Sequence, residues 1–201
     1  MSRTRSFLIW IAILLAPGVA LAAAAMSPLL AWRDPVYITG GFAGVAAMAL
    51  LLLQPLLAGG SLPGLTVQHA KRAHRWIGGT LVAAVIVHVA GLWITSPPDV
   101  IDALLFVSPT PFSAWGVIAM WAVFAAALMA ALRKRLPFRP RNWRLGHTAL
   151  VAIVVVGSVV HAWLIEGTME TVSKAVLCLF VVLATAKIVV GKKAWTSRNR
   201  P

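Results

Sequence analysis

Six long apolar stretches run along this chain, and they limit what it can fold into. Each is long enough to cross the ~30 Å hydrocarbon core of a bilayer as a helix. They cover about residues 7–25, 38–58, 72–95, 112–132, 146–165 and 171–190. The segments between them run only some five to seventeen residues, which leaves no room for a separate extramembrane domain. We therefore expect residues 1–201 to form a single all-α transmembrane domain, a polytopic six-helix bundle.

The composition agrees with a membrane protein and narrows the chemistry. Hydrophobic residues make up 60% of the chain and charged residues 11%, with a mean hydropathy of +0.88. This is far from the composition of an ordinary soluble domain. The single cysteine, Cys178, excludes a disulfide or a cysteine-rich metal site within one chain.

The basic residues are distributed so unevenly that they predict the orientation of the bundle. If the N-terminus is cytoplasmic, sixteen of the eighteen basic residues fall on the inner side, and only Arg33 and Lys174 fall outside. All five acids then belong to the outer loops or their edges: Asp34, Asp99, Asp102, Glu166 and Glu170. The positive-inside rule predicts a multi-pass protein of a bacterial-type inner membrane with both termini cytoplasmic.

The same distribution explains the net charge of +13 without nucleic acid. A basic inner face beside anionic lipid accounts for it, and a docking surface for an acidic partner is compatible with it.

The first apolar stretch has a second interpretation as a cleavable signal peptide. Ser2, Arg3, Thr4 and Arg5 precede its apolar run, and small residues occur at 20–22. Cleavage would leave five spans, with the remaining charge pattern keeping the same orientation.

Four histidines recur at one interval in two of the predicted spans. His74 and His88 are fourteen residues apart in the third span, and so are His147 and His161 in the fifth. Fourteen steps of ~100° bring a residue back to within ~40° of its starting direction, and the ~1.5 Å rise separates the two imidazoles by ~21 Å on one helix face. Both spans run from the inside to the outside, so His74 matches the depth of His147, and His88 that of His161.

Paired histidines at two depths favour haem over other metals. A lone intramembrane histidine is often a hydrogen-bonded packing residue, but four at matched depths are poorly explained that way. Zinc and copper usually require three or four protein ligands, whereas haem iron needs only two axial nitrogens. No Cys-x-x-Cys-His motif occurs, so we expect two non-covalent b haems between the third and fifth helices.

Further polar residues lie near the predicted inner site. Arg75, Arg144 and Lys187 are placed to bind haem propionates, or to extend to lipid phosphates instead. His69 is expected as a solvated residue of the inner loop and a reserve ligand. The tryptophans near the inner boundary, including Trp76 and Trp143, are expected to form an interfacial aromatic belt.

The histidine segments resemble a known family. The segments A-H-R-W-I-G-G at 73–79 and V-H-V at 87–89, with R-N-W-R-L-G-H at 141–147 and V-H-A at 160–162, resemble the third and fifth helices of the ferric reductase-like transmembrane domain family. The resemblance covers about residues 35–190. The family includes ferric reductases, NADPH oxidases and the haem membrane subunit that supplies a periplasmic methionine sulfoxide reductase. It implies that His74, His147, His88 and His161 ligate two b haems, and that electrons run from a cytosolic flavin to the outer side.

The sequence differs from the reductases and oxidases in one respect that bears on the electron donor. Those proteins continue into a flavin and NADPH domain, but here only about ten residues follow the last span and no Gly-rich dinucleotide fingerprint occurs. We therefore expect a separate donor, a cytoplasmic flavin reductase, a flavin domain outside this sequence or a quinol. The predicted acceptor is a periplasmic redox protein.

Two other functions are compatible with the sequence. One is a terminal reductase of ferric chelates or oxygen at the outer haem. The other is a transporter that uses the histidine pairs without haem.

Overall fold

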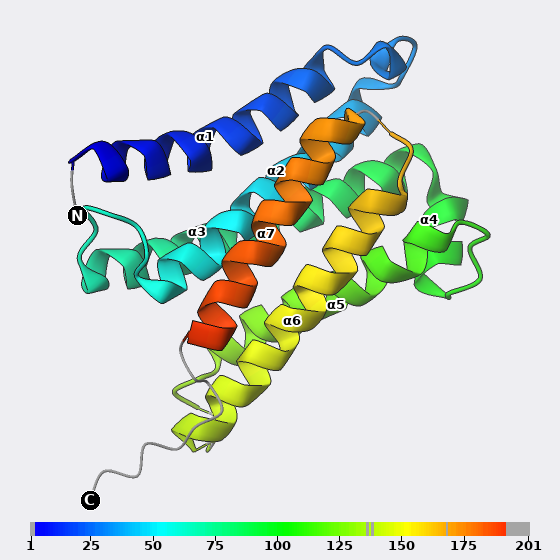
Figure 1. The fold of residues 1–201 in the computed structure, drawn as a ribbon. Helices are drawn as coiled ribbons and strands as arrows, with labels where there is room; N and C mark the ends of the chain where they lie inside the picture. Colours follow the sequence, from blue (N-terminus) through cyan, green and yellow to red (C-terminus); the bar gives the residue numbers. More distant parts are fainter. Residues whose placement is uncertain (1–2, 136, 138, 168, 192–201) are drawn as a thin grey trace, which may run out of the picture.

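Helices are the only regular elements in the residues that the computed structural model describes, 3–135, 137, 139–167 and 169–191. Six of them are long and apolar enough to span a membrane (Figure 1): α1 (Arg3–Ala25), α2 (Pro35–Gly59), α3 (Val67–Thr95), α5 (Pro111–Ala131), α6 (Pro140–Leu164) and α7 (Thr171–Gly191). Large apolar side chains such as Phe7, Ile94 and Val190 are more than half exposed, as lipid-facing surfaces require. The prediction of a six-helix, multi-pass membrane protein is confirmed.

Two helices begin several residues before the apolar pattern does. Helix α3 begins at Val67 because the Thr66 side chain accepts a hydrogen bond from the His69 N–H and caps the first turn. Helix α6 begins at Pro140, since proline is well tolerated in the first turn of a helix. The placement of His69 in a loop is therefore wrong. It lies exposed in the first turn of α3, with Nδ1 2.8 Å from Thr66 Oγ1.

A short helix that the sequence did not predict connects α3 to α5. Helices α4 (Pro97–Leu104) and η1 (Pro28–Leu30) are too short to span a bilayer, so a search for apolar stretches overlooks them. Helix α4 is amphipathic: Val100 is buried, and Asp99 accepts a hydrogen bond from the Ser96 hydroxyl.

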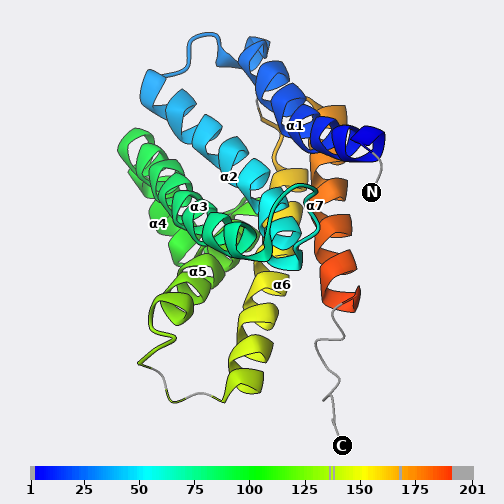
Figure 2. The same cartoon turned by 90° about the vertical axis from the view of Figure 1, so that its left-hand side faces the viewer.

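The long helices form two antiparallel hairpins with α7 against both (Figure 2). Helices α2 and α3 make one hairpin, α5 and α6 make the other, and α7 packs on α2 and α6. In the first hairpin a Cβ added at Gly91 would lie 2.9 Å from the Cα of Gly40, so the two backbones are in direct contact. Leu177 and Val181 of α7 are the largest fully buried side chains and lie at the centre of the core. This arrangement leaves α3 and α6 on different hairpins, so their histidines meet through tertiary packing.

The start of α1, the α2–α3 loop and the end of α7 lie at one end of the bundle. The Trp10 Nε1–H donates to the Pro63 carbonyl at 3.2 Å, and a Cβ at Gly59 would collide with Ile188. Because the spans alternate in direction, the α5–α6 connection belongs to the same end.

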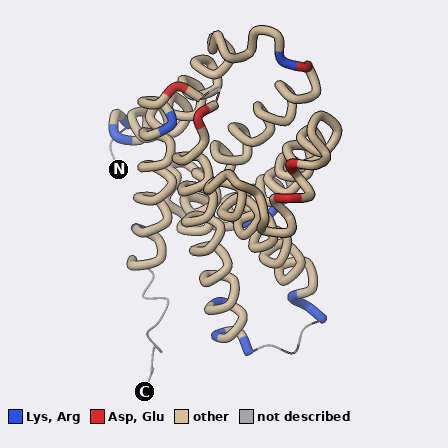
Figure 3. The backbone as a smooth tube through the Cα atoms, turned by 90° about the vertical axis from the view of Figure 1, so that its right-hand side faces the viewer, with Lys and Arg blue, Asp and Glu red and all other residues tan. Residues whose placement is uncertain are grey.

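Charge divides along this axis as predicted. Of the sixteen basic residues assigned to the inner side, Lys192, Lys193, Arg198 and Arg200 lie outside the described residues, and the other twelve belong to this end. In Figure 3 the blue segments beside the grey α5–α6 connection lie at the bottom, far from the red segments in the upper half, whereas the blue segments beside the N-terminus lie higher in this view. The assignment of this end to the cytoplasm stays a prediction.

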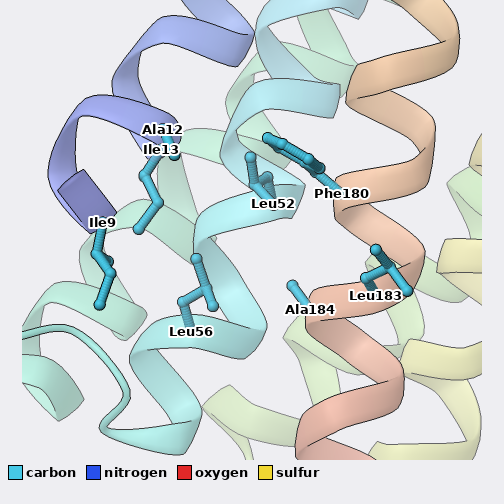
Figure 4. A pocket seen from close by; sticks show the side chains of 8 residues that line it. All are labelled: Ile9, Ala12, Ile13, Leu52, Leu56, Phe180, Leu183 and Ala184. Atoms are coloured by element: carbon cyan, nitrogen blue, oxygen red, sulfur yellow. The ribbon is translucent and has the colours of Figure 1, made fainter. Parts of the chain in front are cut away.

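A small apolar cavity of about 210 Å³ lies between α1, α2 and α7 (Figure 4). Its lining consists of Ile9, Ala12, Ile13, Leu52, Leu56, Phe180, Leu183 and Ala184. None of these side chains ionises or is a usual metal ligand.

Candidate functional site

His88 of α3 and His161 of α6 meet between the two hairpins. Their ring centroids lie 6.4 Å apart, and the ring planes cross at 79°. When two imidazoles bind the same metal ion, each ring nitrogen lies about 2 Å from the ion and roughly 1 Å from its own ring centroid. The two centroids are then about 6 Å apart. The spacing therefore suits one metal ion held between the two rings.

Each of these rings is oriented by a backbone carbonyl of its own hairpin. The His88 Nδ1–H donates to the Gly40 carbonyl of α2, and the His161 Nδ1–H donates to the Phe112 carbonyl of α5, both at 2.8 Å. Metal-bound histidines usually donate their other ring N–H in this way. Because Nδ1 carries the proton in this arrangement, Nε2 of each ring is the nitrogen left to bind a metal.

A glycine one turn beyond each of those carbonyls lies against the same ring. A Cβ added at Gly44 of α2 would lie 2.9 Å from His88 Nδ1, and one added at Gly116 of α5 would lie 2.6 Å from His161 Nδ1. No real side chain fits at these distances. The two outer histidines are thus enclosed by the same combination of carbonyl and glycine in both hairpins.

The inner histidines are held less uniformly. His74 Nδ1 lies 3.2 Å from the Gln54 carbonyl, and the Gln54 side-chain amide donates back to the His74 carbonyl at 3.3 Å. His147 lies near enough to His74 for an electrostatic interaction. That the two rings hold one haem stays a prediction. The His147 Nδ1, however, is buried without a hydrogen-bond partner among the described residues.

An aromatic stack takes the place of a carbonyl at His147. The indole of Trp143 lies parallel to the His147 ring, with centroids 5.1 Å apart and planes at 10°. On the indole ring lies the Arg133 guanidinium, 4.5 Å from the centroid, and the indole N–H donates to the Met129 carbonyl at 3.3 Å. From the sequence, Trp143 is expected only in an interfacial belt. The signal for the stack was its spacing of four residues from His147, which places both rings on one helix face.

The arginines predicted to bind propionates lie near the inner histidines in sequence and are exposed. Arg75 follows His74 on α3, and Arg144 lies one turn before His147 on α6. A carboxylate partner for either stays a prediction.

The donor set fits haem better than a bare metal ion. Among the described residues, no group of three or more His, Cys, Asp or Glu side chains could hold a metal ion. What the structure offers at the outer level is two adjacent imidazoles with their Nδ1 atoms already engaged. Haem iron takes four ligands from the porphyrin and needs only two such nitrogens.

Comparison with known proteins identifies the family of the chain. No match was found among curated proteins or among solved structures. The sequence matches the family described as ferric reductase like transmembrane component over residues 41–158, more than half of the chain. The match contains His74, His88 and His147 and ends three residues before His161, which the fold brings opposite His88. The chain belongs to the ferric reductase-like transmembrane component family.

Proposed function

We propose that this protein passes electrons across the membrane through two bis-histidine b haems. His88 and His161 ligate the outer haem, and His74 and His147 ligate the inner one. The observation that carries the proposal is the outer pair, with ring centroids 6.4 Å apart and each Nδ1 engaged by a carbonyl. A bound haem supplies reversible one-electron chemistry of its iron.

The chain's own residues orient the ligands and exclude water. The carbonyls of Gly40 and Phe112 prevent the outer imidazoles from rotating and make them better donors. Buried apolar side chains of α2, α6 and α7 form the core of the bundle, including Leu52, Val155 and Val181. Two ligand levels ~21 Å apart on each helix supply two redox sites across the bilayer.

We assign the donor to the basic end of the bundle and the acceptor to the acidic end. The donor is a cytoplasmic flavin reductase or a quinol, which brings its own flavin or quinone, and the acceptor is a periplasmic redox protein. The acidic end holds all five acids but only Arg33 and Lys174 as basic residues, which suits a protein acceptor better than an anionic ferric chelate.

The haem content tests this proposal. A pyridine haemochrome assay on purified protein should give two b haems per chain. His88→Leu and His161→Leu should each lose one haem, whereas His69→Leu, which removes an exposed histidine of the same α3, should retain both. A wild-type protein without haem would contradict the proposal and support a transporter with polar histidine pairs.

A further inference from the structure

The tip of the α5–α6 hairpin gathers exposed cations around one aromatic stack. Its exposed basic residues, all within the described part of the chain, are Arg133, Lys134, Arg135, Arg139, Arg141 and Arg144. No acid neutralises them, because all five acids of the chain belong to the opposite end. Figures 1 and 2 show this hairpin tip extending beyond the end of α7. The tip is a strongly positive surface on the side assigned to the cytoplasm.

One indole joins this surface to a predicted haem ligand. Arg133 is exposed, Trp143 is half-buried, and His147 lies behind Trp143 in a parallel stack. The hydrogen bond from the indole N–H to the Met129 carbonyl holds the Trp143 ring in place. A molecule bound at the tip is therefore separated from the His147 ring by a single aromatic side chain.

We propose that this tip is the docking surface for an acidic electron-donor protein, and that Trp143 is the contact through which a docked donor reaches His147. The inference rests on the proposed function and specifies its partner. Each electron that the donor loses is gained at the inner haem site, and Trp143 itself is neither oxidised nor reduced. The indole acts by filling the gap between the donor and the ligand.

The stack favours a protein donor over anionic lipid as the occupant. Arginines that bind lipid phosphates extend their guanidinium groups toward the headgroups. Here the guanidinium of Arg133 lies on the indole, where it is held by a cation–π interaction. Arg141 and Lys134 remain exposed beside it and can attract a negatively charged protein surface.

Binding measurements test the surface, with a matched charge reversal as control. The protein is placed in nanodiscs of phosphatidylcholine, and the affinity of oxidised flavodoxin, an acidic flavoprotein, is measured at low and high salt. Lys134→Glu with Arg141→Glu should weaken binding by about tenfold at low salt and much less at high salt. Lys71→Glu with Arg72→Glu makes the same charge change on exposed residues of α3 and should alter binding by less than roughly twofold.

Three binding results would overturn the docking surface. Equal weakening by the two double variants would mean a diffuse attraction to the whole inner face. If the hairpin variant bound flavodoxin as tightly as the wild type, the tip would not be the docking surface. In the third result, the hairpin variant, held in phosphatidylcholine nanodiscs, binds flavodoxin like the wild type but associates less with added phosphatidylglycerol nanodiscs. That result would identify the tip as a lipid-binding patch.

Stopped-flow reduction and EPR spectroscopy test the role of Trp143. At saturating flavodoxin, which cancels any change in affinity, Trp143→Leu should slow haem reduction several-fold. It should slow reduction by dithionite, which needs no docking, much less. Trp143→Phe keeps an aromatic ring against His147 and should restore most of the rate. The low-spin EPR signal of the inner haem should shift in the Leu variant, because the His147 ring loses the surface that fixes its orientation.

The outcomes separate this inference from the proposed function. Trp143→Leu protein reduced by flavodoxin at the native rate would contradict the role of Trp143 while leaving two-haem electron transfer intact. Wild-type protein that carries no haem would instead contradict the proposed function itself.

Discussion

His88 and His161 approach each other from different hairpins, and each is held in the same way. The Nδ1 of His88 bonds to a carbonyl 48 residues earlier in the chain, and that of His161 to a carbonyl 49 residues earlier. The ring centroids then lie 6.4 Å apart, and the planes cross at 79° in an edge arrangement. Two antiparallel hairpins of similar design therefore contribute one histidine each to this contact.

The crossing angle of these rings predicts a spectroscopic signature. When the planes of two axial imidazoles are nearly perpendicular, a low-spin ferric haem has a strongly anisotropic EPR signal with a large maximal g value. The outer haem should show this signal. The measurement is EPR on oxidised protein, with His161→Leu to identify the outer signal. A rhombic spectrum typical of parallel imidazoles would show that the rings rotate away from the observed geometry.

Substitutions at Gly44 and Gly116 should disturb the outer haem selectively. An added Cβ at Gly116 would lie 2.6 Å from His161 Nδ1 and 2.7 Å from its Cε1, closer than the 2.9 and 3.1 Å at Gly44 and His88. Overpacking of this kind typically costs about 1–3 kcal/mol. Gly116→Ala should therefore lower outer haem content and shift its midpoint potential more than Gly44→Ala does.

The matched control for these glycine variants is Gly41→Ala. Gly41 lies on the same helix as Gly44, and an added Cβ there meets nothing within 4 Å. It should retain both haems with native potentials. Comparable losses in all three variants would show that helices α2 and α5 tolerate no added volume, and that ring contact has no special role.

The topology follows from the charge partition and can be checked with reporters. Fusions after residue 136 or at the C-terminus should be active only with a reporter that functions in the cytoplasm, because sixteen of eighteen basic residues share that side. Fusions after Asp102 should be active only with a periplasmic reporter. The reverse pattern would exchange the inner and outer haems and reverse the proposed direction of electron flow.

The electron source is predicted to lie outside residues 1–201. With no dinucleotide motif in the chain, NADPH alone should not reduce the haems, whereas NADPH with a flavin reductase, or a quinol, should. His147→Leu should then stop donor-driven reduction of the outer haem. If the donor still reduced the outer haem of the His147→Leu protein at the native rate, electrons would enter from the outer side.

The turn between α6 and α7 should lose stability at low pH. The backbone N–H groups of Val172 and Ser173 donate to the Glu170 carboxylate and hold the pKa of Glu170 below its usual 4.5. Because the pKa is lowered in the folded state, the stabilising effect is complete above about pH 4.5 and is lost as the pH falls through the lower folded value.

Thermal unfolding followed by tryptophan fluorescence checks this effect. Glu170→Gln should lower the Tm at pH 7 and narrow the difference between pH 7 and pH 3. Glu166→Gln, an exposed carboxylate of the same turn, serves as the control and should behave like the wild type. An unchanged Tm in Glu170→Gln at pH 7 would show that the hydrogen bonds to the Glu170 carboxylate contribute nothing measurable to stability.

Local helix geometry made much of this protein predictable. Apolar length specifies the six spans because a helix in lipid must satisfy its own backbone and cover about 30 Å. The fourteen-residue spacing places His74 and His88 on one face of α3, and the same holds for His147 and His161 on α6, because 3.6 residues make a turn whatever the neighbours are. The apolar pattern does not predict that His69 lies in α3, because the cap formed by Thr66 has no apolar signal. It does not predict α4 either, because an eight-residue amphipathic helix has no long apolar stretch.

Only the tertiary structure decided what surrounds those histidines. The carbonyls of Gly40 and Phe112 reach the outer rings because two helix pairs pack in one particular register, which depends on close backbone contacts such as Gly40 against Gly91. Gly44 and Gly116 could not be distinguished in the sequence from other glycines in the spans, because their role depends on a ring from the neighbouring helix. The sequence determined which residues could be ligands through local periodicity. The packing of separate helices decided how each ring is held, because every contact that holds the outer rings joins residues more than forty positions apart.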